Sequence, residues 1–213
     1  MITVHGRNTS SNVQPVIWLL AELDLPHERL DVGGAFGGTD TPEYRAMNPM
    51  GLIPTLQDGD VTMFESQAIL RYLGARHSES LWPADPVARS SADQWMEWTK
   101  TTVAPEVVYK IFWQLVRTPA AVRDTAALEA SIIKVAEIMA TAEAQLAKHD
   151  WLSGPEMTLA DICFGAQLYR YFTLPFERTD LPKLAAYYQR LNKRPAYAEH
   201  VMVSYEPLRA PGA

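Results

Sequence analysis

Polar side chains that could do chemistry gather in two places in the first third of the 213-residue chain. The first is the loop GRNTSSN at residues 6–12, where hydroxyls and amides stand just before an apolar helical segment. The second is NPMGLIPTLQDGDVTMFESQAI at residues 48–69, where a helix opens on Glu65 and Ser66. Pro54 is unusual there, because a proline removes a ladder donor and is tolerated only at the start or edge of a strand. Taken alone, Glu65 and Ser66 would cap a helix and Pro54 would precede a strand.

Other chemistries have little support in the sequence. The five histidines show no ligand-like spacing and the chain has one cysteine, Cys163, so we predict no metal site. The stretch GGAFGG at residues 33–38 lacks the Gly-Lys-Ser/Thr that follows in a phosphate loop. Cys163 lies in an apolar helical segment and is expected to be a buried small hydrophobe.

Composition is that of an ordinary globular protein, with 47% hydrophobic and 21% charged residues. A net charge of −6 argues against nucleic acid or an anionic membrane as the main partner. The sequence has neither an apolar run near 18 residues nor a signal-peptide pattern at its start. One cysteine forbids an internal disulfide and fits a reducing compartment, so we expect a cytoplasmic protein.

Strands and helices alternate over the first 80 residues. The apolar spacing after residue 13 is typical of an amphipathic helix, and Asp58-Gly59 is a hairpin signal. The predicted elements are strands at 2–4 and 27–32, helices at 13–23, 41–47 and 65–77, and two strands around Asp58-Gly59. A crossover through the first helix makes the first two strands parallel, which gives a thioredoxin-like layout.

Beyond Ser80 we expect only helices. A proline-punctuated linker, LWPADPVARS, leads into a long helix over 87–116 that should kink at Pro105. Thr158 to Asp161 forms a capping box that opens a further apolar helix, and Asp161 is expected to be structural. Other helices are predicted at 124–149, 181–191 and 195–201. The fold class is therefore α/β followed by all-α, with domains at 1–79 and 89–213 and a linker at 80–88.

The whole chain resembles the cytosolic glutathione S-transferase (GST) superfamily, in its bacterial theta/zeta/nu-like branch. The matching stretches are TVHGRNTSSNVQPVIWLLAELDLPHE, NPMGLIPTL, ESQAILRYL, WPADPVAR and MTLADI, in order along the chain. The resemblance implies a thioredoxin-like glutathione-binding domain followed by an all-helical C-terminal GST domain. It also implies an enzyme that conjugates the thiolate of glutathione, its co-substrate, to a hydrophobic electrophile without a metal, and that forms a homodimer.

The resemblance also assigns roles in glutathione binding. Pro54 would follow a cis bond, so that the backbone of Ile53 pairs with the cysteinyl backbone of glutathione like an added strand. Ser66 and the helix N-terminus would bind the γ-glutamyl carboxylate, and Glu65 the γ-glutamyl ammonium. Many relatives carry a basic residue where this chain has Leu52. The glycyl carboxylate must therefore find another partner, and Arg7, the 33–39 loop and water are the candidates.

The thiolate is the nucleophile in such chemistry, and something must stabilise it. The loop after the first strand has neither Tyr nor Cys, which disfavours the classes that use those residues. Ser10 matches the active serine of theta- and zeta-like members and is our first candidate. Asn12 matches the asparagine of nu-like members, which reduce disulfides with glutathione, and Ser11 is the third candidate.

Tyr109 and Trp113 stand four residues apart, hence on one helical face, and are expected to form an apolar wall for the electrophile. Three hypotheses compete: conjugation that uses Ser10, disulfide or peroxide reduction that uses Asn12, and a non-catalytic binding module. The presence of Pro54, Glu65 and Ser66 together argues against the third. The sequence does not identify the electrophile.

Overall fold

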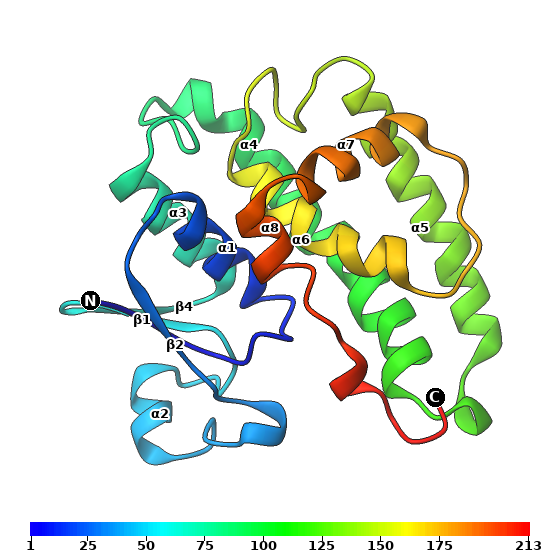
Figure 1. The fold of residues 1–213 in the computed structure, drawn as a ribbon, viewed down its shortest axis with the longest axis horizontal. Coiled ribbons are helices and arrows are strands. Elements are labelled where there is room, and N and C mark those ends of the chain that lie inside the picture. The colour runs from blue at the N-terminus through cyan, green and yellow to red at the C-terminus, as the bar shows by residue number, and fades with distance from the viewer.

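The computed structural model describes residues 1–213, and Figure 1 shows a small sheet with helices beside a larger group of helices. Four strands form the sheet in the order β2-β1-β3-β4. They are β1 Ile2–His5, β2 His27–Leu30, β3 Thr55–Asp58 and β4 Val61–Phe64. β1 and β2 run parallel, whereas β3 is antiparallel to both β1 and β4. The predicted β-α-β unit and hairpin are therefore confirmed.

Three helices flank this sheet: α1 Gln14–Glu22, α2 Pro42–Met47 and α3 Ser66–His77. α1 and α3 lie on the side that faces the other helices, and α2 lies on the opposite side (Figure 1). α1 is held by burial, since Val16, Trp18 and Leu20 are fully shielded from solvent. Burying a large apolar side chain stabilises the fold by about 1.5–3 kcal/mol. Thr41 caps α2 as predicted, because its hydroxyl accepts the Tyr44 N–H at 3.2 Å.

The helical part follows in one run. Its α-helices are α4 Pro86–Trp98, α5 Thr125–Leu146, α6 Leu159–Thr173, α7 Pro182–Asn192 and α8 Pro195–His200. Between α4 and α5 lie two π-helical segments, η2 Thr99–Val103 and η3 Pro105–Arg117. Short 3₁₀ turns complete the chain at η1 Gly34–Phe36, η4 Ala120–Val122 and η5 Glu206–Leu208. The capping box predicted at Thr158 and Asp161 is confirmed at the start of α6.

The long helix predicted over 87–116 is α-helical only as far as Trp98, and the kink predicted at Pro105 stays a prediction. The hydrogen-bond register changes earlier, at Thr99, and Pro105 opens the second π-helical segment. The hydroxyls of Thr99 and Thr101 donate at 2.8 Å to the carbonyls of Trp95 and Glu97, respectively, one turn earlier. Such side-chain bonds compete with the backbone N–H for the same acceptor. The change from α-helix to the wider π-helix therefore begins at the threonines, and Pro105 lies within the π-helical region.

The two parts share one continuous core. Trp18 of α1 packs edge-on against Tyr197 of α8 with ring centroids 4.8 Å apart. Gly165 in α6 permits this approach, because a Cβ there would lie 3.0 Å from the Trp18 ring. The sheet part and the helical part are therefore packed directly against each other through α1, α6 and α8. Every helix of the structure is too short or too polar to span a lipid bilayer.

Candidate active site

All nine residues selected from the sequence line one cavity of about 310 Å³ between the sheet and the helical part. They are Ser10, Ser11, Asn12, Ile53, Pro54, Glu65, Ser66, Tyr109 and Trp113. The volume is at the lower end of the range of about 300–1,000 Å³ that is usual for small-molecule sites. Three separate segments of the first part and one helix of the second therefore converge on the same space.

The wall of the cavity at Ile53 offers unused backbone groups. The Ile53–Pro54 peptide bond is cis, and Pro54 stands just before β3, where no ladder donor is needed. The N–H and C=O of Ile53 bond to no group of the chain. By contrast, the Leu52 carbonyl accepts both the Tyr44 hydroxyl at 2.7 Å and the Asn48 amide at 2.8 Å. Ile53 thus presents a donor and an acceptor to an extended ligand, as a sheet edge does.

The start of α3 forms a second polar wall. The helix begins at Ser66, one residue later than predicted, because Glu65 has a φ of 69° and cannot be helical. A non-glycine residue in such a conformation costs about 1–3 kcal/mol, and strained residues cluster at ligand sites. No side chain caps α3, and the Ser66 hydroxyl bonds to no group of the chain. Free N–H groups and the positive end of the helix dipole therefore face the cavity.

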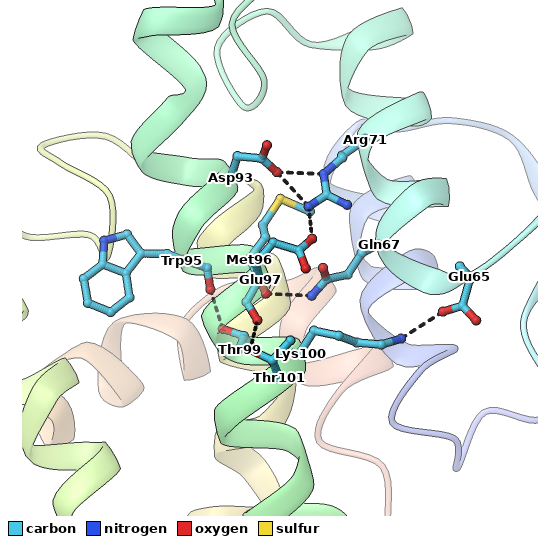
Figure 2. A network of polar contacts seen from close by, with 10 residues as sticks. All are labelled: Glu65, Gln67, Arg71, Asp93, Trp95, Met96, Glu97, Thr99, Lys100 and Thr101. Carbon is cyan, nitrogen blue, oxygen red and sulfur yellow. Dashed lines mark hydrogen bonds and ion pairs between the residues drawn. The ribbon is translucent and has the colours of Figure 1, made fainter.

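A lysine from the helical part reaches the same place. The Lys100 ammonium on η2 lies 2.9 Å from Glu65 Oε2, as Figure 2 shows. Nothing local in the sequence around Lys100 indicates this contact, since the partners are far apart in the chain. Behind this pair, side chains of α3 bond to α4 through Gln67–Met96, Arg71–Asp93 and Arg71–Glu97 (Figure 2).

The loop before α1 places the three candidate thiol-activating residues at the cavity. Ser10 is buried, and its Oγ accepts the Asn12 N–H at 3.3 Å. Its carbonyl accepts the N–H groups of Val13 and Gln14, both at 3.0 Å, so the residue is held firmly. The hydroxyl proton of Ser10 meets no acceptor in the chain and remains available to a ligand. Ser11 and Asn12 are half-buried, and their side chains bond to no group of the chain.

Arg170 of α6 anchors this loop from the other side. Its guanidinium donates to the Thr9 carbonyl at 2.9 Å and to Gln14 Oε1 at 3.0 Å, and it is almost fully buried. Burial and the neighbouring Arg7 lower its pKa to about 10, so it stays protonated at neutral pH. No acid pairs with it, so it favours an anion near Ser10. The sequence pattern did not mark Arg170 as a site residue, although it is the one charged residue in ICFGAQLYRYF.

The opposite wall is aromatic and comes from η3. Tyr109 and Trp113 remain 56% and 45% exposed, and their ring centroids lie 6.2 Å apart at 68°. Leu208 of η5 joins them at the cavity. The chain end is fastened to η3, because the Ala210 N–H donates to the Val116 carbonyl at 2.8 Å. The arrangement supplies an apolar surface beside the polar walls.

The protein's own cysteine does not take part in this site. Cys163 is buried, as predicted, and burial raises the pKa of its thiol to about 12. A thiolate in the cavity would therefore have to come from a ligand. No cluster of three or more His, Cys, Asp or Glu side chains is arranged to hold a metal ion.

Fold and site together define a two-part protein with a thioredoxin-like sheet, and comparison with known proteins agrees. Residues 4–81 match the family model for the GST N-terminal domain, and residues 125–190 match that for the C-terminal domain. GST GstB of Escherichia coli (strain K12) is 40% identical over 206 residues, 95% of this chain and 99% of that protein. GST 3 of Zea mays is 33% identical over 75% of this chain and 73% of its own.

A solved structure extends the likeness to three dimensions. It is the theta-class GST of the citrus canker pathogen Xanthomonas axonopodis pv. citri with glutathione bound. It superposes with a TM-score of 0.91 at 46% identity and covers 95% of this chain and 98% of its own. The chain belongs to the glutathione S-transferase family.

Proposed function

We propose that this chain binds glutathione and conjugates its thiolate to a hydrophobic electrophile. In this reaction the cysteinyl sulfur attacks an electrophilic carbon and either displaces a leaving group or adds to a double bond. Ser10 donates a hydrogen bond to the sulfur and so favours the thiolate. Ile53 pairs with the cysteinyl backbone, and Ser66 with the N-terminus of α3 binds the γ-glutamyl carboxylate.

One observation carries the proposal. The unpaired backbone groups of Ile53, the uncapped start of α3 and the free proton of Ser10 all face one 310 Å³ cavity. These are the groups that a peptide with a terminal carboxylate and a central thiol would use. The likeness to the theta-class enzyme, whose structure contains glutathione, supports the same assignment. Tyr109 and Trp113 then border the electrophile.

The second candidate is a nu-like disulfide or peroxide reductase that uses Asn12. It is favoured by the Asn12 amide, which lines the cavity and bonds to no group of the chain. The third, a non-catalytic binding module, would give no reason for a buried serine to keep a hydroxyl proton free. A panel of halogenated aromatics, maleyl compounds and disulfides separates the three, because each predicts a different set of consumed substrates.

Glutathione binding is tested first by titration calorimetry on the wild type and Ser66→Ala. Loss of a hydrogen bond to a carboxylate should weaken binding about tenfold, since such bonds contribute about 1.5–3 kcal/mol. Ser90→Ala, a change at an exposed serine of α4, is the matched control. Equal affinity of Ser66→Ala and the wild type would remove Ser66 from the site.

We also propose that the protein is a cytoplasmic homodimer, as the family resemblance implies. Light scattering should give about twice the chain mass of 23.9 kDa at micromolar concentration. A monomeric mass would contradict the dimer. Cell fractionation tests the location, and recovery outside the cytosolic fraction would contradict it.

A further inference from the structure

Two arginines that line the cavity have neither an ion-pair nor a hydrogen-bond partner in the chain. Arg7 and Arg117 form no ion pair and donate no side-chain hydrogen bond, whereas every other arginine of the chain donates at least one. Both line the cavity. The buried Nε of Arg7 is therefore an orphaned donor, which a ligand could satisfy.

The two arginines line the same cavity, and each is positioned by a neighbour. Gly34 packs against Arg7, since a Cβ there would lie 3.0 Å from its Nε. Arg117 lies over the Trp113 ring, with its central carbon 4.9 Å from the ring centroid. Burial and, secondarily, repulsion by Arg117 lower the pKa of Arg7. Among the residues that line the cavity, the only acid is Glu65, and Lys100 is already paired with it.

Arg7 is half-buried and Arg117 is exposed. Two like charges without a counterion repel each other, and a carboxylate that contacts both would relieve the repulsion. Arg–carboxylate pairs are among the strong hydrogen bonds of proteins. We propose that Arg7 and Arg117 bind a carboxylate on the electrophile, so that the preferred substrates are electrophilic aromatic acids. The inference rests on the proposed conjugation and names the substrate class of that site.

The position of Arg117 favours the electrophile over glutathione as the source of this carboxylate. Tyr109, Trp113 and Arg117 follow one another at intervals of four residues along η3 and all line the cavity. A ring that packs on Tyr109 and Trp113 would therefore direct a substituent toward Arg117. The groups proposed for glutathione, at Ile53 and Ser66, belong to the sheet part, as Arg7 does, so Arg117 on η3 is the residue that separates the two sources. The glycyl carboxylate of glutathione is the rival source.

A suitable probe is 4-chloro-3,5-dinitrobenzoate. The thiolate forms a C–S bond at the ring carbon that bears chlorine, and the electron pair passes into the nitro-substituted ring. The C–Cl bond then breaks, and chloride leaves with the pair. No oxidant or reductant is needed, and the carboxylate stays unreacted on the arginines. The neutral counterpart is 4-chloro-3,5-dinitrobenzamide, which has the same reacting carbon.

The experiment compares kcat/KM for the acid and the amide in the wild type, Arg7→Gln and Arg117→Gln. We expect a loss of at least tenfold with the acid in each variant and of less than twofold with the amide. Arg89→Gln is the matched control, because Arg89 also lies over a tryptophan, Trp82, but outside the cavity. Equal losses with acid and amide would overturn the proposal. A raised KM for glutathione, with the acid-to-amide ratio unchanged, would assign the arginines to the glycyl carboxylate and overturn it as well.

A binding measurement separates this inference from the proposed function. Unreactive 3,5-dinitrobenzoate and 3,5-dinitrobenzamide are titrated into the protein with glutathione present. The acid should bind at least tenfold more tightly, and Arg117→Gln should abolish the difference. If neither chlorinated compound is conjugated but the acid still binds preferentially, the conjugation proposal fails and the anion site stands. If acid and amide bind equally, the anion site fails whatever the activity.

Discussion

The ammonium of Lys100 lies 2.9 Å from the carboxylate of Glu65 and joins η2 to the start of α3. Both side chains are partly exposed, at 40% and 55%, so the pair borders the cavity without being buried in it. In the proposed complex the γ-glutamyl group brings one ammonium and one carboxylate to this point. Glu65 and Lys100 carry the complementary charges, so the pair matches a zwitterion.

Replacing Lys100 should therefore weaken glutathione binding. We expect Lys100→Met to raise the Kd for glutathione about threefold to tenfold, because one of two complementary charges is lost while Glu65 remains. Thermal stability should change little, since exposed ion pairs contribute little. Calorimetry at low and high salt measures the effect. Lys110→Met, which removes a lysine paired with Glu106 on η3, is the control. Tighter binding in Lys100→Met would mean that Lys100 competes with the ligand for Glu65.

The assignment of Ser10 is tested by the titration of bound glutathione. If Ser10 donates to the sulfur, Ser10→Ala should raise the pKa of the bound thiol and lower conjugation at neutral pH about tenfold. The reason is that a hydrogen bond to an anion contributes about 1.5–3 kcal/mol, and 1.4 kcal/mol is a factor of ten. The ultraviolet absorbance of the thiolate, followed as a difference spectrum against pH, measures the pKa of the bound thiol. Glutathione affinity should stay close to that of the wild type, because its ends are bound elsewhere.

Asn12→Ala is the matched variant in the same loop. It should change conjugation less than Ser10→Ala and should affect disulfide reduction only if the nu-like mechanism operates. If the pKa of the bound thiol shifted in Asn12→Ala but not in Ser10→Ala, Asn12 rather than Ser10 would be the residue that stabilises the thiolate. The reductase would then be the better description of the enzyme.

Local signals in the sequence were enough for most of the fold. The Asp58-Gly59 hairpin, the Thr41 cap and the Thr158 capping box each depend on residues a few positions apart, and all three are confirmed. The nine residues chosen for the site also converge on one cavity. Their order within the family motifs carried that prediction, because residue types alone would have left Glu65 and Ser66 as a cap. The domain limits at 79 and 88 stay a prediction.

What the sequence did not indicate depends on contacts between distant segments. Lys100 meets Glu65 across the junction of the two parts, and Arg170 reaches Thr9 from α6. Neither pair has a spacing that a local pattern could show. The positive φ of Glu65 is likewise a property of the assembled structure, since glutamate rarely adopts it unaided. The sequence therefore indicated the residues proposed to bind glutathione, but it did not indicate that the charges of Lys100 and Arg170 lie beside them.

Arg170 should stabilise both the fold and the bound thiolate. Arg170→Met removes its bonds to Thr9 and Gln14, so we expect a loss of about 2–4 kcal/mol in the free energy of unfolding. The pKa of the thiol of bound glutathione should also rise, because a positive charge beside the Ser10 loop is lost. Urea unfolding and thiol titration measure the two effects.

Arg178→Met separates these effects. Arg178 also donates to backbone carbonyls, those of Tyr171, Leu174 and Phe176, but it lies outside the cavity. It should destabilise the protein and leave the thiol titration in place. If Arg178→Met and Arg170→Met moved the titration equally, the role of Arg170 would be structural alone.

Glu22 should make stability depend on pH. Its carboxylate accepts the Trp18 Nε1–H at 2.7 Å within α1 and the Arg194 Nε–H at 2.8 Å, and the second bond links α1 to the residue that precedes α8. Burial alone would raise the pKa of Glu22, but the bonds from Arg194 and Trp18 outweigh it and the pKa is lowered. A lowered pKa means that the folded protein binds the proton less readily than the unfolded chain does. The stabilisation is therefore present above the unfolded pKa, about 4.3, and is lost as pH falls through the folded value.

Glu22→Gln should accordingly lower the free energy of unfolding by about 1–3 kcal/mol at pH 7. The difference from the wild type should shrink as pH is lowered below about 4, where the wild-type carboxylate also becomes neutral. Urea unfolding at several pH values between 7 and 3.5 gives the curve. Glu137→Gln, which removes an exposed partner of Lys134, should change stability little at any pH. A deficit of Glu22→Gln that stayed constant with pH would show that packing, rather than the charge of Glu22, holds α1 against α8.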